Sequence, residues 1–417
     1  MNNVHMIRFA AAVLLLAASA SAQTLATGDS RSVSQPVYPA VCTTLSAQFT
    51  TAQRSSPPTT DDTSRLQAAL TTCAGTGKSV VLAASGSNNA FYSSSITVSG
   101  EGLVINSGVT LYGNTGYEKQ FQLVYATGTN AFIGGPGTID GRGDIVSGSP
   151  RLVEAEFLTN FIIYNVTLTQ AKHPNLYIQS GNGATVWNVT IRTPADRSNA
   201  DGIDIDSITN VTVANSSVNA GDDGIAVKTN VSAASNITVK SSKFYGTHGL
   251  SIGSQTMYGV SNVLFTGNYV YGTDLNGIIS TDPNAIRVKS DVDCGGPVDR
   301  VTYTNTCMTG IKHLIVLDTD YGSCSGNTGT PVFTNIVVNG AVSTASDTKN
   351  AYSRFRGISA SSLVNAYIAN IALDTNKQNT DQYAIVDLDN VDGFLPAGTD
   401  VTTGSFNLSG SVPTCTF

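Results

Sequence analysis

The sequence is poor in charged residues, histidine and tryptophan. Charged side chains make up 12% of its 417 residues, and there are four histidines and one tryptophan, Trp187. The formal net charge of −7 argues against a nucleic acid partner, because such partners select basic surfaces. An acidic chain that binds an anionic ligand must gather its basic groups locally.

Long apolar runs are missing after the first 22 residues. Arg8 precedes a short apolar run that ends near Ala18, and Ala20-Ser-Ala22 supplies a small-residue cleavage site. This pattern predicts a secretory signal peptide over residues 1–22, since the run is too short to span a bilayer. We therefore expect a secreted, extracellular and monomeric protein without a membrane partner, in which residues 23–417 form one catalytic domain.

Metal-binding patterns are also missing. The six cysteines include no C-x-x-C pair, and no histidine stands near them at ligand spacing. No metal and no cofactor are expected. An even number of cysteines in an exported chain indicates disulfides, and six allow 15 pairings. We expect a Cys42–Cys73 bond and local bonds among the later four cysteines.

What the chain does have is a repeat. Short β-branched runs alternate with Gly, Asn or Asp, loosely as x-x-V-x-x-N-x-x-V, at intervals of 23, 27, 26, 26, 38, 35 and 30 residues. The units begin at Asn160, Gly183, Asn210, Asn236, Asn262, Arg300, Asn335 and Asn365.

A period near 25 residues suits one coil of a parallel β-helix, in which stacked units bury what one unit cannot. The predicted fold is therefore all-β, a single-domain right-handed parallel β-helix. Residues 62–73 predict a capped amphipathic helix that covers its N-terminal end. Seven N-x-S/T sequons occur, mostly at the repeat's asparagines, and stacking at turns is the favoured interpretation.

A second string recurs inside the coils and carries chemical groups. Asp201-Gly-Ile-Asp-Ile-Asp-Ser matches segments that begin at Asp223, His248 and Asn284. This register predicts Asp201, Asp223 and His248 in one column, roughly 4.8 Å apart from coil to coil, with Asp222 one residue before it.

Strand alternation assigns the remaining positions of the string. Two apolar columns should point into the core, and Arg287 and Lys289 should project outward. Strict alternation would turn Asp201 and Asp223 inward, but the glycine after each predicts a bend. The two apolar columns are Ile203, Ile225, Leu250 and Ile286, and Ile205, Val227, Ile252 and Val288.

Three carboxylates this close should not all ionise easily, so we expect at least one raised pKa. A protonated acid beside a carboxylate base is the arrangement that glycoside hydrolysis requires. A lone aspartate at a β-helix turn would more simply form an Asx turn. The alignment of several charged groups in one register favours catalysis.

These strings resemble the polygalacturonase family of glycoside hydrolases, family 28. Its N-T-D, G/Q-D-D, G-H-G and R-I-K blocks correspond here to Asn199-Ala-Asp201, Gly221-Asp-Asp223, Thr247-His-Gly249 and Arg287-Val-Lys289. Ile139-Asp-Gly-Arg-Gly143 and Asp318-Thr-Asp-Tyr321 are similar to two further segments. Ala200, Thr247 and Val288 depart from the family pattern, and none of them removes a catalytic group.

The resemblance implies inverting hydrolysis of polygalacturonate. Asp222 would protonate the glycosidic oxygen, Asp201 and Asp223 would hold and deprotonate the attacking water, and His248 would tune the acid. Stacked carboxylates about 5 Å apart would by the general separation rule predict retention; we follow the family, because three acids can accommodate a water differently from two.

The resemblance also implies a substrate-binding set. Arg287 and Lys289 would bind the galacturonate carboxylate beside the cleaved bond, and Tyr321 would line the same subsite. Asn199 is a candidate to orient the water, and Lys228 to meet another substrate carboxylate.

Three other residues have weaker patterns. His173 suits either a groove loop or a plain surface position. His313 and Trp187 are interpreted as structural.

Rival functions remain at this stage. A pectate lyase shares the fold and substrate but uses Ca²⁺, and a β-helical adhesin would need no aligned acids. Within the hydrolases, exo-acting, rhamnogalacturonan and xylogalacturonan enzymes are alternatives to the preferred endo action.

Overall fold

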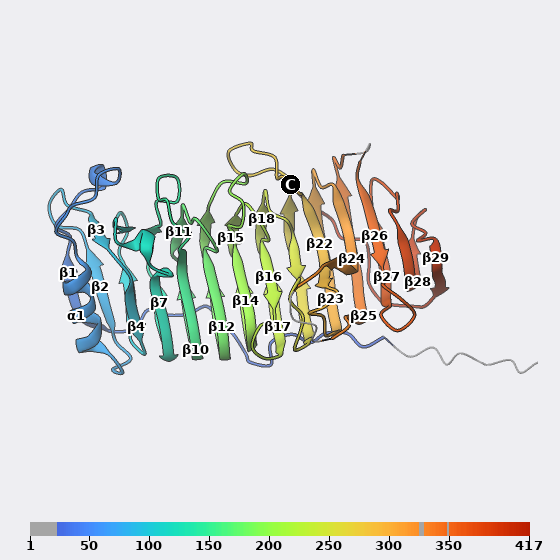
Figure 1. Ribbon diagram of the computed structural model, residues 1–417, viewed down its shortest axis with the longest axis horizontal. Coiled ribbons are helices and arrows are strands. Elements are labelled where there is room, and N and C mark those ends of the chain that lie inside the picture. The colour runs from blue at the N-terminus through green and yellow to red at the C-terminus, as the bar shows by residue number, and fades with distance from the viewer. Residues whose placement is uncertain (1–22, 325–328, 348–349) are drawn as a thin grey trace, which may run out of the picture.

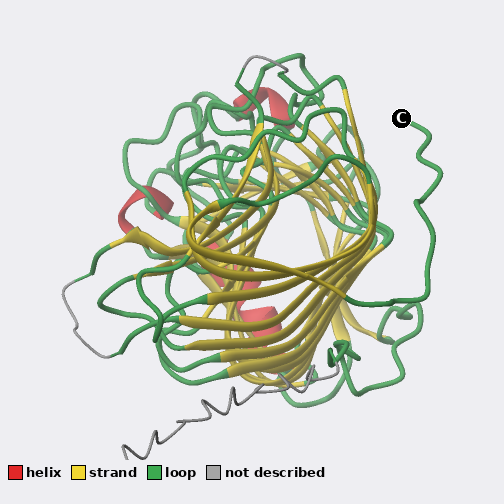
Figure 2. Cartoon of the chain, turned by 90° about the vertical axis from the view of Figure 1, so that its right-hand side faces the viewer, coloured by secondary structure: helices red, strands yellow, loops and turns green. Residues whose placement is uncertain are grey.

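The computed structural model describes residues 23–324, 329–347 and 350–417. The predicted signal peptide lies outside these residues. Within them, 29 strands join in one continuous parallel network that winds around a long axis (Figure 1). Seen along that axis, the strands wrap around a common core (Figure 2). The chain is a right-handed parallel β-helix, as the repeat predicted.

The strands stack into three faces. Face A contains β1 (Val41–Ser46), β2 (Ser79–Ala83), β5 (Gly102–Ile105), β8 (Phe132–Gly134), β17 (Ala234–Lys240), β20 (Val260–Thr266), β23 (Pro297–Thr309), β25 (Val332–Thr344), β27 (Val364–Ala372), β28 (Asp381–Val391) and β29 (Gly398–Ser405).

Face B is built mostly from three- and four-residue strands. Its members are β3 (Ala90–Ser93), β6 (Thr110–Gly113), β9 (Thr138–Asp140), β11 (Thr167–Thr169), β13 (Thr190–Arg192), β15 (Ser217–Asn219), β18 (Lys243–Tyr245) and β21 (Tyr269–Tyr271).

Face C positions the candidate active site. Its members are β4 (Ile96–Ser99), β7 (Gln122–Thr129), β16 (Ile225–Lys228), β19 (Leu250–Ile252), β22 (Asn284–Asp291), β24 (His313–Gly322) and β26 (Tyr352–Arg356). Three long strands turn the corner from face C to face A, namely β10 (Arg151–Tyr164), β12 (Leu176–Trp187) and β14 (Ile203–Ala214).

The strand register predicted by the repeat is confirmed for all eight repeat units, from Asn160 to Asn365. The residue after each unit start pairs with its counterpart in the next coil, from Phe161 through Ala184 to Ala366. The unit-start asparagines Asn160, Asn210 and Asn236 have φ between 57° and 59°. Asparagine tolerates this left-handed conformation, which explains its recurrence at the turns.

The interior is filled by the predicted apolar columns. Ile203, Ile225, Leu250 and Ile286 pair across four coils and have no exposed surface. Each coil therefore buries its apolar side chains against the coils above and below it.

Helix α1 (Thr63–Cys73) lies at the N-terminal end of the stack, as predicted, with Leu66 and Leu70 buried in the core. Asp62 stands at the N-cap position but does not cap the helix with its side chain. Its carboxylate instead accepts the Tyr92 N–H at 2.8 Å and pairs with Arg65. Two single turns of 3-10 helix complete the fold: η1 (Thr51–Gln53) and η2 (Tyr117–Lys119).

Disulfides join Cys42 to Cys73, Cys294 to Cys324 and Cys307 to Cys415. The first two agree with prediction. The third was predicted wrongly as local, because Cys307 and Cys415 are 108 residues apart. The C-terminal segment returns to β23 after the four further face A strands β25, β27, β28 and β29. Separation in sequence therefore does not exclude proximity in space.

Residues 26–35 form an extended N-terminal strap along face A. Its hydrogen bonds begin at Thr302 in β23 and end at Tyr164 in β10. Between these ends the strap bonds to Asn262, Thr238 and Ala184, so it crosses the coils lengthwise (Figure 1).

Candidate active site

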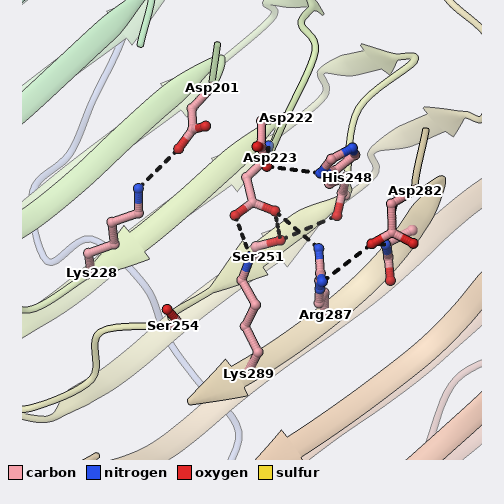
Figure 3. A network of polar contacts seen from close by, with 12 residues as sticks. Asp201, Asp222, Asp223, Lys228, His248, Ser251, Ser254, Asp282, Arg287 and Lys289 are labelled. Carbon is pink, nitrogen blue, oxygen red and sulfur yellow. Dashed lines mark hydrogen bonds and ion pairs between the residues drawn. The ribbon is translucent and has the colours of Figure 1, made fainter. Parts of the chain in front are cut away.

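The predicted acids meet on face C, just before the strands begin. Asp201 precedes β14 by two residues, and Asp223 stands at the same place before β16. The register Ile203–Ile225–Leu250 places Asp201, Asp223 and His248 in one column. Their side chains meet partners on the outer surface (Figure 3), so the expected bend turns them outward.

The bend depends on glycine at close approaches. A Cβ on Gly202 would lie 2.4 Å from Val218 and 2.5 Å from the Gly224 carbonyl oxygen. A Cβ on Gly224 would lie 2.8 Å from the Phe244 ring. Any larger residue would push the acids away from the wall.

Asp223 is the best-anchored acid and is only 3% exposed. Lys289 Nζ donates to its Oδ2 at 2.8 Å, and Ser251 Oγ donates to its Oδ1 at 2.7 Å. The guanidinium of Arg287 lies 3.6 Å from the same carboxylate. These partners come from β19 and β22, which the register brings alongside.

Asp201 shares a cation with a second acid. Lys228 Nζ lies 3.0 Å from Asp201 Oδ2 and 3.1 Å from Asp204 Oδ2. Burial and the charge of Asp201 raise the pKa of Asp204 well above its ordinary value, although Lys228 opposes this. Burial acts to lower the pKa of Lys228, but the two carboxylates together raise it.

Asp222 pairs with His248, whose Nδ1 lies 2.9 Å from Asp222 Oδ1. Although burial acts to raise it, the hydrogen bond and charge of His248, with the charge of Lys289, lower the pKa of Asp222 to about 2. Burial acts to lower the pKa of His248, but Asp222 raises it overall. When this pair holds one proton, the proton therefore resides on the imidazole and Asp222 is a carboxylate.

At least one of the three acids was expected to have a raised pKa, but the pKa of Asp222, the predicted acid, is lowered. Each of the three acids has a cation of its own: Lys228 for Asp201, His248 for Asp222 and Lys289 for Asp223. These cations offset the repulsion on which the expectation was based. Asp204, which shares Lys228 with Asp201, is a neighbouring carboxyl whose pKa is raised.

A cationic pair sits under an aromatic ring beside the acids. The charged ends of Arg287 and Lys289 each lie 5.1 Å from the centre of the Tyr321 ring. Arg287 and Lys289 are 5% and 6% exposed, whereas Tyr321 is 42% exposed. This group offers a partly desolvated positive site with one aromatic wall, which suits an anionic ring-shaped ligand.

The comparisons with known proteins agree with this arrangement. The family model described as "Glycosyl hydrolases family 28" matches residues 73–389 of this chain. The chain belongs to glycosyl hydrolases family 28. It is thus a glycoside hydrolase, and the enzyme class and family inferred from the sequence are confirmed.

Relatives within family 28 match most of the chain. The "Endo-polygalacturonase" of Pectobacterium carotovorum subsp. carotovorum is 35% identical over 72% of this chain and 79% of its own length. The "Polygalacturonase" of Ralstonia solanacearum is 30% identical over 95% of this chain and 87% of its own. A solved polygalacturonase from Erwinia carotovora ssp. carotovora superposes with a TM-score of 0.68 at 28% identity, covering 93% of this chain and all of that one.

Asp282 was missed by the sequence reasoning for this family 28 site. Its carboxylate lies 3.4 Å from Arg287 and 2.9 Å from His313 Nδ1. Burial opposes the change, but His313 and Arg287 lower the pKa of Asp282 strongly. Its position five residues before Arg287 could have indicated that it lies near the site. The repeat could not place it, because Asp282 lies in an inserted loop that matches no position of the repeat.

His313 was interpreted as structural, but the register gives it a second role. It pairs with Asn284, which continues the column of Asp201, Asp223 and His248. His313 is 9% exposed and packs on Tyr352, with ring centres 4.6 Å apart. It therefore connects the core to the site through Asp282.

Three further residues singled out in the sequence are His173, Asn199 and Trp187. His173 is half-buried. Burial lowers the pKa of its imidazole, and the charge of Asp201 acts in the opposite direction. Asn199 is exposed, with φ of 57°. Trp187 packs beside the buried Tyr164, which agrees with a structural role.

The described residues offer neither a cluster suited to a metal ion nor a helix suited to crossing a membrane. No group of three or more His, Cys, Asp or Glu residues there could hold a metal ion. No helix in the described part is long and apolar enough to cross a membrane.

Proposed function

We propose that this chain hydrolyses the α-1,4-galacturonosyl linkages of polygalacturonate by endo action and with inversion. The observation that carries the proposal is the Arg287–Lys289–Tyr321 group immediately beside three carboxylates. A uronate unit offers one carboxylate and one sugar face, which match these partners. Relatives named polygalacturonase support the same substrate, and two are named for endo action.

Asp222 would act as the general acid, and the proton would come from its pair with His248. In the free protein that proton resides on the imidazole, because the pKa of Asp222 is about 2. The positive charge of Lys289 contributes to this low value. A substrate carboxylate bound at Lys289 would offset that charge and shift the shared proton toward Asp222.

Asp201 and Asp223 would hold and deprotonate the attacking water from adjacent coils. Each of these carboxylates lies within ion-pair distance of a lysine, Lys228 for Asp201 and Lys289 for Asp223. Lys228, expected to meet a substrate carboxylate, already pairs with Asp201 and Asp204. We therefore assign it the positioning of Asp201. Asn199 remains a candidate for orienting the water.

We also propose that the protein acts outside the cell as a monomer on pectin. The predicted signal peptide over residues 1–22 and the three disulfides support export. Residues 23–417 would then be the catalytic domain.

Digestion of polygalacturonate with EDTA present tests the function. We expect reducing ends to appear, a rapid fall in viscosity, oligomeric early products and initial inversion at the new anomeric centre by NMR. Unsaturated products would indicate a lyase, monomer alone would indicate exo action, and no reducing ends from polygalacturonate would refute the substrate. Rhamnogalacturonan and xylogalacturonan serve as comparison substrates.

A further inference from the structure

A surface depression lies on face C, apart from the three acids. It encloses about 460 Å³. Its lining comes from η2, the start of β10 and the loop before β12: Glu118, Lys119, Gln120, Phe121, Ser149, Arg151 and His173. None of these residues has a role in the chemistry above.

The register relates this depression to the cleavage centre. Val153 pairs with Leu176, which pairs with Ile203. Counting back two residues in each strand places Arg151, Pro174 and Asp201 in one column. Arg151 is thus two coils before Asp201, roughly 10 Å along the axis at the usual strand spacing. An extended polysaccharide that follows face C from Asp201 toward the N-terminal end would reach it.

The side chain of Phe121 is unusual for a surface residue. It is 86% exposed, although its ring has a large apolar area. An aromatic ring presented beside a polar depression can stack on the apolar face of a sugar. Burial of that ring by a ligand would remove apolar surface from water.

Arg151 supplies a positive group held in a fixed position. Its guanidinium carbon lies 3.7 Å from the centre of the Tyr177 ring, and one terminal nitrogen pairs with Glu154. The other two nitrogens of its guanidinium group have no hydrogen-bond partner among the described residues. A planar guanidinium with free donors can grip a carboxylate, and the exposed Lys119 adds a second cation.

His173 completes the depression on the side facing the acids. Burial lowers the pKa of its imidazole, although Asp201 acts in the opposite direction. A neutral imidazole carries one donor and one acceptor, which suits sugar hydroxyls.

We propose that this depression is a distal subsite for one galacturonate unit, with Phe121 stacking on the ring and Arg151 binding the carboxylate. The inference rests on the proposed function, because it names where a longer substrate is held. The subsite would strengthen binding of long chains and set where along a chain the enzyme cuts.

The test compares Phe121→Ala with wild type on reducing-end-labelled oligogalacturonates of increasing length. The variant should lose roughly three- to tenfold in kcat/KM on long oligomers, the size of one aromatic contact. It should match wild type on oligomers too short to reach the depression. Its bond-cleavage positions should shift on long oligomers only. Arg151→Lys should give the same length dependence.

Phe157→Ala is the matched control. Phe157 lies on β10 and, like Phe121, is an exposed phenylalanine (69%), but it does not line the depression. It should behave as wild type at every length. Equal kinetics of Phe121→Ala and wild type at all lengths would overturn the subsite alone. So would an equal loss in Phe157→Ala. Failure of wild type to cut any oligogalacturonate would overturn the proposed function and the subsite with it.

Discussion

Two columns of polar residues run along this β-helix and behave differently. In the asparagine column, Asn165, Asn188 and Asn215 share φ values of 52–54°, and Asn188 Nδ2 donates to Asn165 Oδ1 at 2.8 Å. In the aspartate column, Asp201 and Asp223 make no such mutual bond, and each is held by a lysine.

The difference follows from the chemistry of the two side chains. An amide is both donor and acceptor, so it can stack on a copy of itself. A carboxylate is only an acceptor, and like charges on adjacent strands repel. A repeat can therefore place identical asparagines for stability, but it can place acids only where other strands supply cations. The predictions below test this contrast, from the largest effect to the smallest.

Asp222→Asn should cause the largest loss of activity. It removes the proposed proton donor, whose contribution is typically 10²–10⁴-fold. We expect kcat to fall by at least that range, with an unchanged thermal midpoint and near-normal binding of oligogalacturonate. More than roughly a tenth of wild-type activity in the purified variant would exclude Asp222 as the acid.

Lys228→Met should remove the cation that pairs with Asp201. It leaves two buried carboxylates, Asp201 and Asp204, without their shared partner. Loss of one partner of a buried pair costs about 3–5 kcal/mol of unfolding free energy. Urea unfolding measures this. The loss should shrink at acid pH, where Asp204 with its raised pKa takes up a proton. A loss that is independent of pH would contradict the pairing.

Arg287→Lys keeps the charge but removes the planar fork. One charge-assisted hydrogen bond is worth about 1.5–3 kcal/mol, so kcat/KM on polygalacturonate should fall about 10- to 100-fold. The loss should shrink as the methyl esterification of the substrate rises, because the ester masks the carboxylate. Equal fold losses at every degree of esterification would instead indicate a structural cation.

His248→Gln should move the pH profile. In wild type the Asp222–His248 pair keeps its proton up to the raised pKa of His248, so the alkaline limb of kcat/KM lies above roughly 6.5. Without the imidazolium, the proton belongs to Asp222 alone and is lost at lower pH, nearer the ordinary range of an aspartate. The alkaline limb should therefore shift to lower pH. An unshifted limb would mean that His248 does not share the proton.

Asn188→Ala tests the neutral column. It removes a hydrogen bond between exposed amides, which is worth about 0.5–1.5 kcal/mol. We expect a small drop in unfolding free energy and unchanged kcat/KM. A marked loss of activity would show that the two columns are not independent.

Much of the fold was predictable because a β-helix repeats its contacts. A matched string such as the one at Asp201 and Asp223 determines strand register, inward and outward faces, and the column of acids. The repeat could not predict the disulfide partner of Cys415 or the position of Asp282 at the site. These residues lie in a returning tail and an inserted loop, where no neighbouring coil repeats the pattern.

The protonation of the site was predicted less well. The expectation of a raised pKa counted the three acids and ignored their cations. Lys289 was predicted to project outward and Lys228 to meet a substrate carboxylate, but the choice between substrate and aspartate as their partner depends on side-chain distances. The outward parity of Asp204 was readable from the string that begins at Asp201, and it would have revealed the fourth acid.

The N-terminal strap has a consequence for how the molecule unfolds. In a coil stack each coil contacts only its neighbours, so unfolding can begin at one end and proceed coil by coil. The strap connects Thr302 to Tyr164 across the intervening coils by bonding to Asn262 and Thr238 on the way. Loosening any of these coils must also release part of the strap. The strap thus couples neighbouring units into one cooperative block, which spans the coils that carry the proposed catalytic acids.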